Sequence, residues 1–234
     1  MSAPMDATQS ELQIVEINGR PFVCGLYWKP LRSVRSYMAE AKEIGRKEKW
    51  EMVTIRKGRT VIQAGFAPKG KRRLKGMYSL AAALAGQLGE NWIGVFPIGP
   101  DRYALVAVYK GAVAPGFDLI SSRDEVEPKL REVYSLLSND PQADFVKSGR
   151  VIAPPEFSFG AESLLLADLL IPKALKNEYK LRPLTLGLTP KEFVVIAVGL
   201  ILLAGAGLGA KWWFDEKRAE EERVAARAAA QAQL

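Results

Sequence analysis

The stretch FVVIAVGLILLAGAGLGA, from Phe193 to Ala210, holds eighteen consecutive residues without a charged side chain. A helix rises about 1.5 Å per residue, so this length spans about 27 Å and approaches the roughly 30 Å hydrocarbon core of a bilayer. Just before it, Thr189-Pro190-Lys191-Glu192 matches a capping box, with Thr as the N-cap and Pro at the first helical position. The pattern predicts one transmembrane helix over residues 191–214. The alternative is a buried helix of a soluble domain.

The residues that flank this stretch suit the two interfaces of a membrane. Lys191 precedes it. On the other side, Trp212 and Trp213 offer amphipathic rings, and Lys211 has a side chain long enough to reach the headgroups. We expect these four residues to anchor the helix at the lipid surface.

Within the stretch, Gly205 and Gly209 form a small-xxx-small pair, which lets two membrane helices approach closely. The pair makes a homo-oligomer through helix–helix contact possible. Because glycine is also common in single spans, it does not require one.

After the stretch, residues 215–234 consist largely of Ala, Glu, Arg and Gln, which are good helix formers. Acidic side chains at 220–222 oppose Arg223 and Arg227 at helical spacing. We expect a charged helical stalk, either a solvated single helix or one strand of a coiled coil. No stop pattern closes this helix, which predicts that the stalk is truncated and that more chain normally follows.

The basic residues near the stretch do not decide its orientation. Five Lys and Arg stand between positions 173 and 191, and five between 211 and 227, so the positive-inside count is even. The first twenty residues contain no basic segment followed by an apolar one, and no secretory signal is visible. We therefore expect a bacterial inner-membrane protein with its N-terminus in the cytoplasm and its C-terminus in the periplasm.

The residues before the stretch have the patterning of a folded domain. We expect disorder over residues 1–11, a cytoplasmic α/β domain over 12–176 and a juxtamembrane tether over 177–190. Asn18-Gly19, the strongest short hairpin pattern, predicts a first ribbon, and Lys57-Gly58 a second. Helices are expected at 31–47, 77–88, 123–137 and 163–170, and further strands at 92–97, 102–109, 111–120 and 151–155.

These elements give a mixed-sheet, hairpin-rich α/β domain without long parallel βαβ repeats. The run 111–120 is interrupted by Gly and Pro, which suits the edge of a sheet.

The composition excludes several kinds of chemistry. The chain has no His, which removes the commonest general base and metal ligand. Its one cysteine, Cys24, cannot form an intramolecular disulfide, and the apolar run around it predicts a small core residue. The net charge of +7 suits nucleic acid or the anionic cytoplasmic leaflet, but most of it is expected to be solvated surface.

The Gly-rich segments lack the standard phosphate cradles. No GxxxxGK[ST] loop occurs, no GxGxxG follows a predicted strand, and residues 160–163 lack the glycine of a nucleophile elbow. Acidic residues are numerous, but the sequence fixes no pair of them in one cleft. We expect no catalytic residue, no metal and no cofactor.

The most basic segment is the loop at residues 69–75. Its candidate partner- or lipid-contact residues are Lys69, Lys71, Arg72, Arg73 and Lys75. One interpretation is a solvated turn, and the other is a patch for acidic lipid, an acidic protein face or nucleic acid. A charge cluster of this kind speeds the encounter with an acidic partner more than it adds affinity.

Three segments resemble a known family. They are FVCGLYW from Phe22 to Trp28, GMYSLAA from Gly76 to Ala82, and the Gly111 to Asp118 region with its Pro115-Gly116. Together with the late apolar stretch, they resemble the PilO-type pilin accessory proteins of type IVb pilus systems.

The resemblance implies a bitopic inner-membrane component of the pilus assembly platform. It implies a cytoplasmic domain similar to part of an actin-like ATPase fold, which contacts the assembly ATPase or the polytopic platform protein. Where an actin-like phosphate loop would have Asp-x-Gly, this chain has Glu16-Ile17-Asn18-Gly19, which argues against nucleotide binding. The family's periplasmic domain is not present in this sequence.

Two functions are therefore compared. The first is a non-enzymatic scaffold of a pilus or a related secretion machine, with assembly-platform proteins and membrane lipid as partners. The second is a membrane-tethered regulator that binds nucleotide or nucleic acid. DNA binding would call for a helix studded with base-reading residues, and none is evident, so no nucleic-acid partner is expected.

Overall fold

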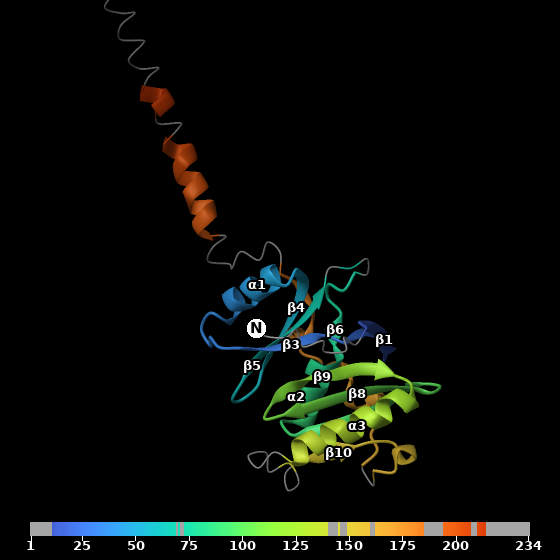
Figure 1. Cartoon of the computed structure of the whole chain (residues 1–234). Coiled ribbons are helices and arrows are strands. Elements are labelled where there is room, and N and C mark those ends of the chain that lie inside the picture. The colour runs from blue at the N-terminus through green and yellow to red at the C-terminus, as the bar shows by residue number, and fades with distance from the viewer. Residues whose placement is uncertain are drawn as a thin grey trace, which may run out of the picture. The chain divides into compact units, whose positions relative to one another are not determined.

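The computed structural model describes residues 11–68, 70, 73–139, 145, 149–159, 162–184, 194–206 and 210–213. The chain forms two compact units, Met1–Thr185 and Leu186–Leu234, which we call the N-terminal unit and the C-terminal unit. Each is described separately. The N-terminal unit is a mixed α/β structure with three sheets, which confirms the predicted fold class (Figure 1).

The first sheet has the strand order β11-β4-β5-β3, and all its pairs are antiparallel. Its strands are β3 (Tyr27–Leu31), β4 (Trp50–Lys57), β5 (Ile62–Pro68) and β11 (Arg182–Pro183). Helix α1 (Tyr37–Lys47) packs against one face of this sheet, where Val53, Ile55 and Phe66 are buried (Figure 1). The second predicted ribbon is therefore confirmed as the β4–β5 pair.

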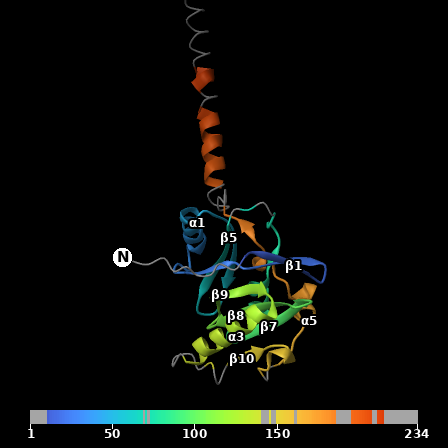
Figure 2. The same ribbon diagram turned by 45° about the vertical axis from the view of Figure 1, so that its right-hand side comes forward.

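The second sheet has the order β10-β7-β8-β9. Its strands are β7 (Trp92–Gly99), β8 (Arg102–Tyr109), β9 (Ala112–Ser121) and β10 (Arg150–Ile152). Alternate residues point to opposite faces of a strand. Helix α3 (Arg123–Ser138) lies along this sheet (Figure 2). Ile93 and Val95 accordingly pack with α3, whereas Trp92 and Phe96 belong to the main core with helix α2 (Leu80–Leu88).

Strand β9 is an edge strand, as its Gly and Pro residues predict. On the outer side of β9, side chains from other elements form hydrogen bonds with its backbone amide and carbonyl groups. Gln63 of β5 accepts from the Val113 amide and donates to the Val113 carbonyl, both at 2.8 Å, and Gln13 donates to the Ile120 carbonyl at 2.8 Å. Polar side chains thus join β9 to the other two sheets.

The third sheet holds β1 (Gln13–Ile17), β2 (Arg20–Cys24) and β6 (Tyr78–Ser79). Asn18 and Gly19 have φ of 52° and 68°, the positive values that a tight type I′ hairpin requires, so the first predicted ribbon is confirmed. Asn18 also donates to the Ala167 carbonyl at 2.8 Å, which fastens the turn to the short helix α5 (Leu166–Leu169).

The last described segment of the N-terminal unit, residues 177–184, differs from the expected tether at 177–190. Lys180 bridges to Tyr78 beside β6, and β11 follows at once as a partner of β4. Tyr179, Leu181 and Leu184 are buried. The segment therefore belongs to the folded unit and connects the first sheet to the third.

Three predicted helices begin later than expected, and the one expected at 163–170 is the short helix α5, Leu166–Leu169. The chain from Leu31 does not enter α1 until Tyr37, because Leu31 ends β3 and the Glu40 carboxylate holds the Arg32 and Ser33 amides at 2.9–3.0 Å. Helix α2 begins at Leu80, because Tyr78 and Ser79 form β6 and Ser79 caps the helix. Three short 3-10 turns, η1 (Pro155–Phe157), η2 (Pro172–Ala174) and η3 (Asn177–Tyr179), complete the unit.

The C-terminal unit contains one apolar helix, Val194–Trp213, long enough to cross a membrane. None of its apolar window is buried, and Gly205, Lys211, Trp212 and Trp213 are exposed. Lys191, Gly209, the predicted stalk at 215–234 and the predicted disorder at 1–10 lie outside the described residues.

Candidate functional site

The predicted basic loop is described only at its C-terminal end. Arg73 and Lys75 are exposed there, whereas Leu74 between them is buried and anchors the loop. Lys69, Lys71 and Arg72 lie outside the described residues.

The end of the loop is fastened to the segment that precedes the C-terminal unit. The Gly76 amide donates to the Leu181 carbonyl at 2.9 Å, and the Leu181 amide donates to the Met77 carbonyl at 2.8 Å. These two bonds join positions that are far apart in the sequence. Arg73 and Lys75 therefore lie close in the structure to the segment that contains Lys180 and Arg182.

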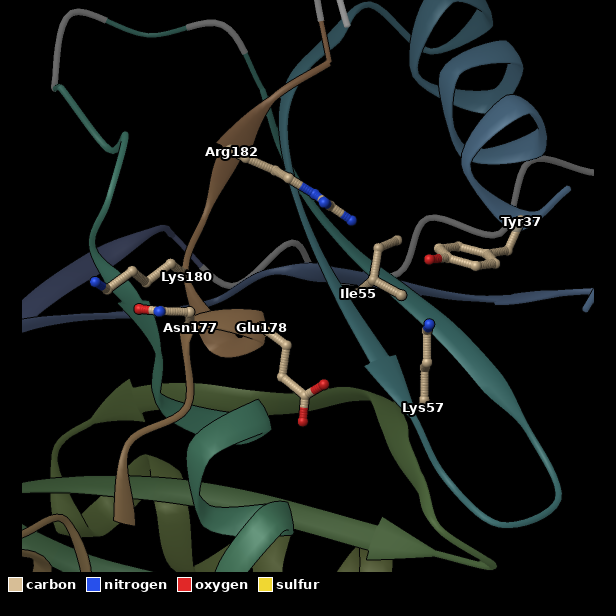
Figure 3. A pocket seen from close by; sticks show the side chains of 7 residues that line it. All are labelled: Tyr37, Ile55, Lys57, Asn177, Glu178, Lys180 and Arg182. Atoms are coloured by element: carbon tan, nitrogen blue, oxygen red, sulfur yellow. The ribbon is translucent and has the colours of Figure 1, made fainter. Parts of the chain in front are cut away.

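A cleft opens between this segment, the end of β4 and the start of α1, and we call it the basic cleft (Figure 3). It encloses about 150 Å³. The residues that line it are Tyr37, Ile55, Lys57, Asn177, Glu178, Lys180 and Arg182. Ile55 is buried beneath it, and Arg182 extends from β11 toward the Ile55 and Tyr37 side.

The three cations of the basic cleft have neutral partners. Lys57 Nζ lies 4.5 Å from the centre of the Tyr37 ring, and Lys180 Nζ lies 5.1 Å from that of Tyr78. Arg182 Nη2 lies 3.0 Å from the sulfur of Met38, a weak acceptor. Contacts of this kind orient a cation without neutralising it.

One acidic residue, Glu178, lines the basic cleft, and its carboxylate lies 3.8 Å from Lys176 Nζ in an ion pair. Three cations and one anion leave the lining with a net charge of +2. Among the described residues, no ion pair joins Lys57, Lys180 or Arg182 to a carboxylate. The cleft is therefore suited to an anionic group.

The cleft could not be inferred from the sequence. Lys57 stands at a predicted hairpin turn, and Lys180 and Arg182 are two of the basic residues before the apolar stretch. Their spacing of two gives no indication of the cleft, because Lys180 points toward Tyr78 and Arg182 points to the other side of the segment, toward Met38 (Figure 3). Their partner elements, β4 and α1, could not be inferred from local sequence.

The most buried polar cluster lies elsewhere, around Asp118 of β9. Its carboxylate accepts from the Trp28 indole at 2.8 Å, from the Leu26 amide at 3.2 Å and from the Cys24 thiol at 2.9 Å. Burial raises the pKa of Asp118, although the three donors lower it in part. Burial and the adjacent carboxylate also raise the pKa of the Cys24 thiol well above its usual range.

This cluster has the geometry of a structural joint. All three donors come from β2, β3 and the link between them, so Asp118 ties those elements to β9. Cys24 and Asp118 are no more than 2% exposed, which leaves no path for a substrate. Within the described parts of the chain, no group of three or more His, Cys, Asp or Glu could hold a metal ion.

Comparison with solved structures identifies a related fold. The crystal structure of the cytoplasmic domain of BfpC superposes with a TM-score of 0.54 and 16% sequence identity. The match covers 74% of this chain and 99% of that chain. No curated protein matches the chain.

The family model of the pilin accessory protein (PilO) matches this chain. It covers residues 22–233, and therefore both the N-terminal unit and the apolar helix. The resemblance expected from the sequence is confirmed: the chain belongs to the pilin accessory protein (PilO) family and is a component of type IV pilus assembly.

Proposed function

We propose that this protein is a non-enzymatic, bitopic scaffold of the bacterial inner membrane, whose N-terminal unit docks other components of a type IV pilus machine. The observation that carries the proposal is the extent of the family match. One family model runs through the N-terminal unit and the apolar helix together, over residues 22–233. Because one family model includes both the folded unit and the apolar helix, we infer that the function of the family requires both parts.

The exposure of the apolar helix supports attachment to a membrane. A core helix of a soluble domain would bury its apolar side chains, and Val194–Trp213 buries none of its window. Twenty residues at about 1.5 Å each reach about 30 Å, which matches the hydrocarbon core. Lys211, Trp212 and Trp213 then lie at one interface.

The expected partners are assembly-platform proteins, including the polytopic platform protein, and the assembly ATPase. Support for docking comes from the exposed basic residues Arg73 and Lys75 beside the basic cleft, which would attract an acidic face. The Asp118 cluster offers no accessible reactive group, which favours a structural role for the N-terminal unit.

Charge reversal in the basic loop tests this function. We expect Lys71→Glu, Arg72→Glu and Arg73→Glu together to leave folding intact and to weaken partner capture from detergent extracts, most strongly at low salt. The control reverses the same number of charges at Arg46, Lys47 and Lys129. Normal pilus assembly and unchanged partner recovery by the loop variant at low salt would place the docking surface elsewhere.

A further inference from the structure

We infer that the basic cleft binds the anionic headgroup of a phospholipid in the leaflet next to the N-terminal unit. The inference rests on the proposed function in one respect, that the apolar helix spans a membrane. It concerns residues that differ from those of the basic loop. It assigns the cleft a ligand of small size and negative charge.

The size of the cleft favours a headgroup over a segment of protein. The cleft offers about 150 Å³, several times the roughly 10–15 Å³ that one water molecule requires on the same measure. That space accommodates a phosphate ester and a short polar substituent. A peptide of even a few residues would have to lie outside it.

The lining supplies the chemistry that a phosphodiester requires. The Arg182 guanidinium offers a planar fork that can bond two phosphate oxygens, and Lys57 adds a second positive charge from the opposite wall (Figure 3). Tyr37 adds a hydroxyl on the side of these two cations, which suits a hydroxyl group of a glycerol headgroup. Ile55 beneath them limits the approach of water from inside the unit.

The position of the cleft along the chain favours lipid over a soluble phosphate. Arg182 stands only twelve residues before Val194, the first residue of the apolar helix. Twelve residues reach at most about 43 Å even when fully extended. Lipid around the apolar helix is therefore tethered to the same chain as the cleft, which replaces a bimolecular encounter by a local one.

Because each cation near an anionic leaflet changes affinity about fivefold, loss of three should weaken binding by about a hundredfold. The experiment titrates the detergent-solubilised full chain with phosphatidylglycerol or with phosphatidylcholine of the same acyl chains and counts bound lipid by native mass spectrometry. We expect the wild-type chain to prefer phosphatidylglycerol, and the variant Lys57→Gln, Lys180→Gln, Arg182→Gln to lose that preference.

The matched control, Arg46→Gln, Lys47→Gln and Lys129→Gln, removes the same charge outside the cleft and should bind like wild type. If the triple cleft variant fails to fold, the single change Lys57→Gln at an exposed position replaces it. Equal phosphatidylglycerol binding by the cleft variant and the control overturns the inference. Displacement of the lipid by millimolar inorganic phosphate or ATP also overturns it and assigns the cleft to a soluble phosphate.

The two proposals fail separately. The lipid titration in detergent reports on the cleft whether or not partners are present, and partner capture by the loop variant reports on docking. A chain that binds phosphatidylglycerol but captures no partner contradicts only the proposed function. The reverse result contradicts only the lipid site.

Discussion

At the scale of single residues, Asp118 shows how a buried charge can hold a fold together. A carboxylate this deeply buried is stable only if its hydrogen-bond capacity is met, and three donors meet it. Asp118→Ala would leave the Trp28 indole and the Leu26 amide without an acceptor. We expect a loss of about 2–4 kcal/mol in the free energy of unfolding, measured by urea denaturation.

The matched variant Asp118→Asn keeps an acceptor oxygen and removes the charge. Because burial raises the folded pKa above its unfolded value of about 3.9, the unfolded chain ionises first as the pH rises. The wild type therefore loses stability as the pH rises from about 4 through the folded pKa, and Asp118→Asn should lack this loss. Parallel stability curves for the two proteins would show that Asp118 does not titrate differently on folding.

Part of the buried cluster around Asp118 could be predicted from the sequence. The apolar run around Cys24 predicted a buried thiol, and the thiol is fully buried. Asp118 gave no comparable indication, since its donors lie about 90 positions earlier and their approach depends on the packing of β9 beside β3. The same limit applies to the basic cleft, whose walls come from distant parts of the chain.

At the scale of elements, residues 177–184 are the part that sequence reasoning misplaced. Hairpins such as β1–β2 and β4–β5 are encoded locally by turn residues between apolar runs, and both were predicted. The pairing of β11 with β4 joins residues more than a hundred positions apart, and the Asn, Glu, Lys and Arg of the segment made it look like a solvated tether. Burial of Tyr179, Leu181 and Leu184 shows that the segment is part of the folded unit.

A truncation series tests the importance of this segment. We expect a chain ending at Thr185 to fold cooperatively and one ending at Lys176 to be largely unfolded. Three buried side chains at about 1.5–3 kcal/mol each approach the whole stability of a typical domain. Urea unfolding followed by circular dichroism compares the two, and equal midpoints would show that β11 adds little.

At the scale of the whole molecule, the sequence was sufficient for the class, the apolar helix and the family, because these depend on composition and regular patterning. The orientation of the helix across the membrane does not follow from such patterning, because equal numbers of basic residues lie on its two sides.

A pair of fusions tests this orientation. We expect a reporter that is active only in the periplasm to work after Leu234 and to fail before Met1. A reporter active only in the cytoplasm is the control and should give the opposite pattern. Periplasmic activity at Met1 would mean that the N-terminal unit lies outside the cytoplasm.

The place of residues 180–184 between two sheets also has a consequence for synthesis of the protein. The chain is made from its N-terminus at about 5–20 residues per second. The strand that completes the N-terminal unit is therefore its last part to leave the ribosome, and the ten residues from Leu184 to Val194 follow within about 0.5–2 s. Final closure of the folded unit and delivery of the apolar helix to the membrane must therefore occur almost together, on the same ribosome.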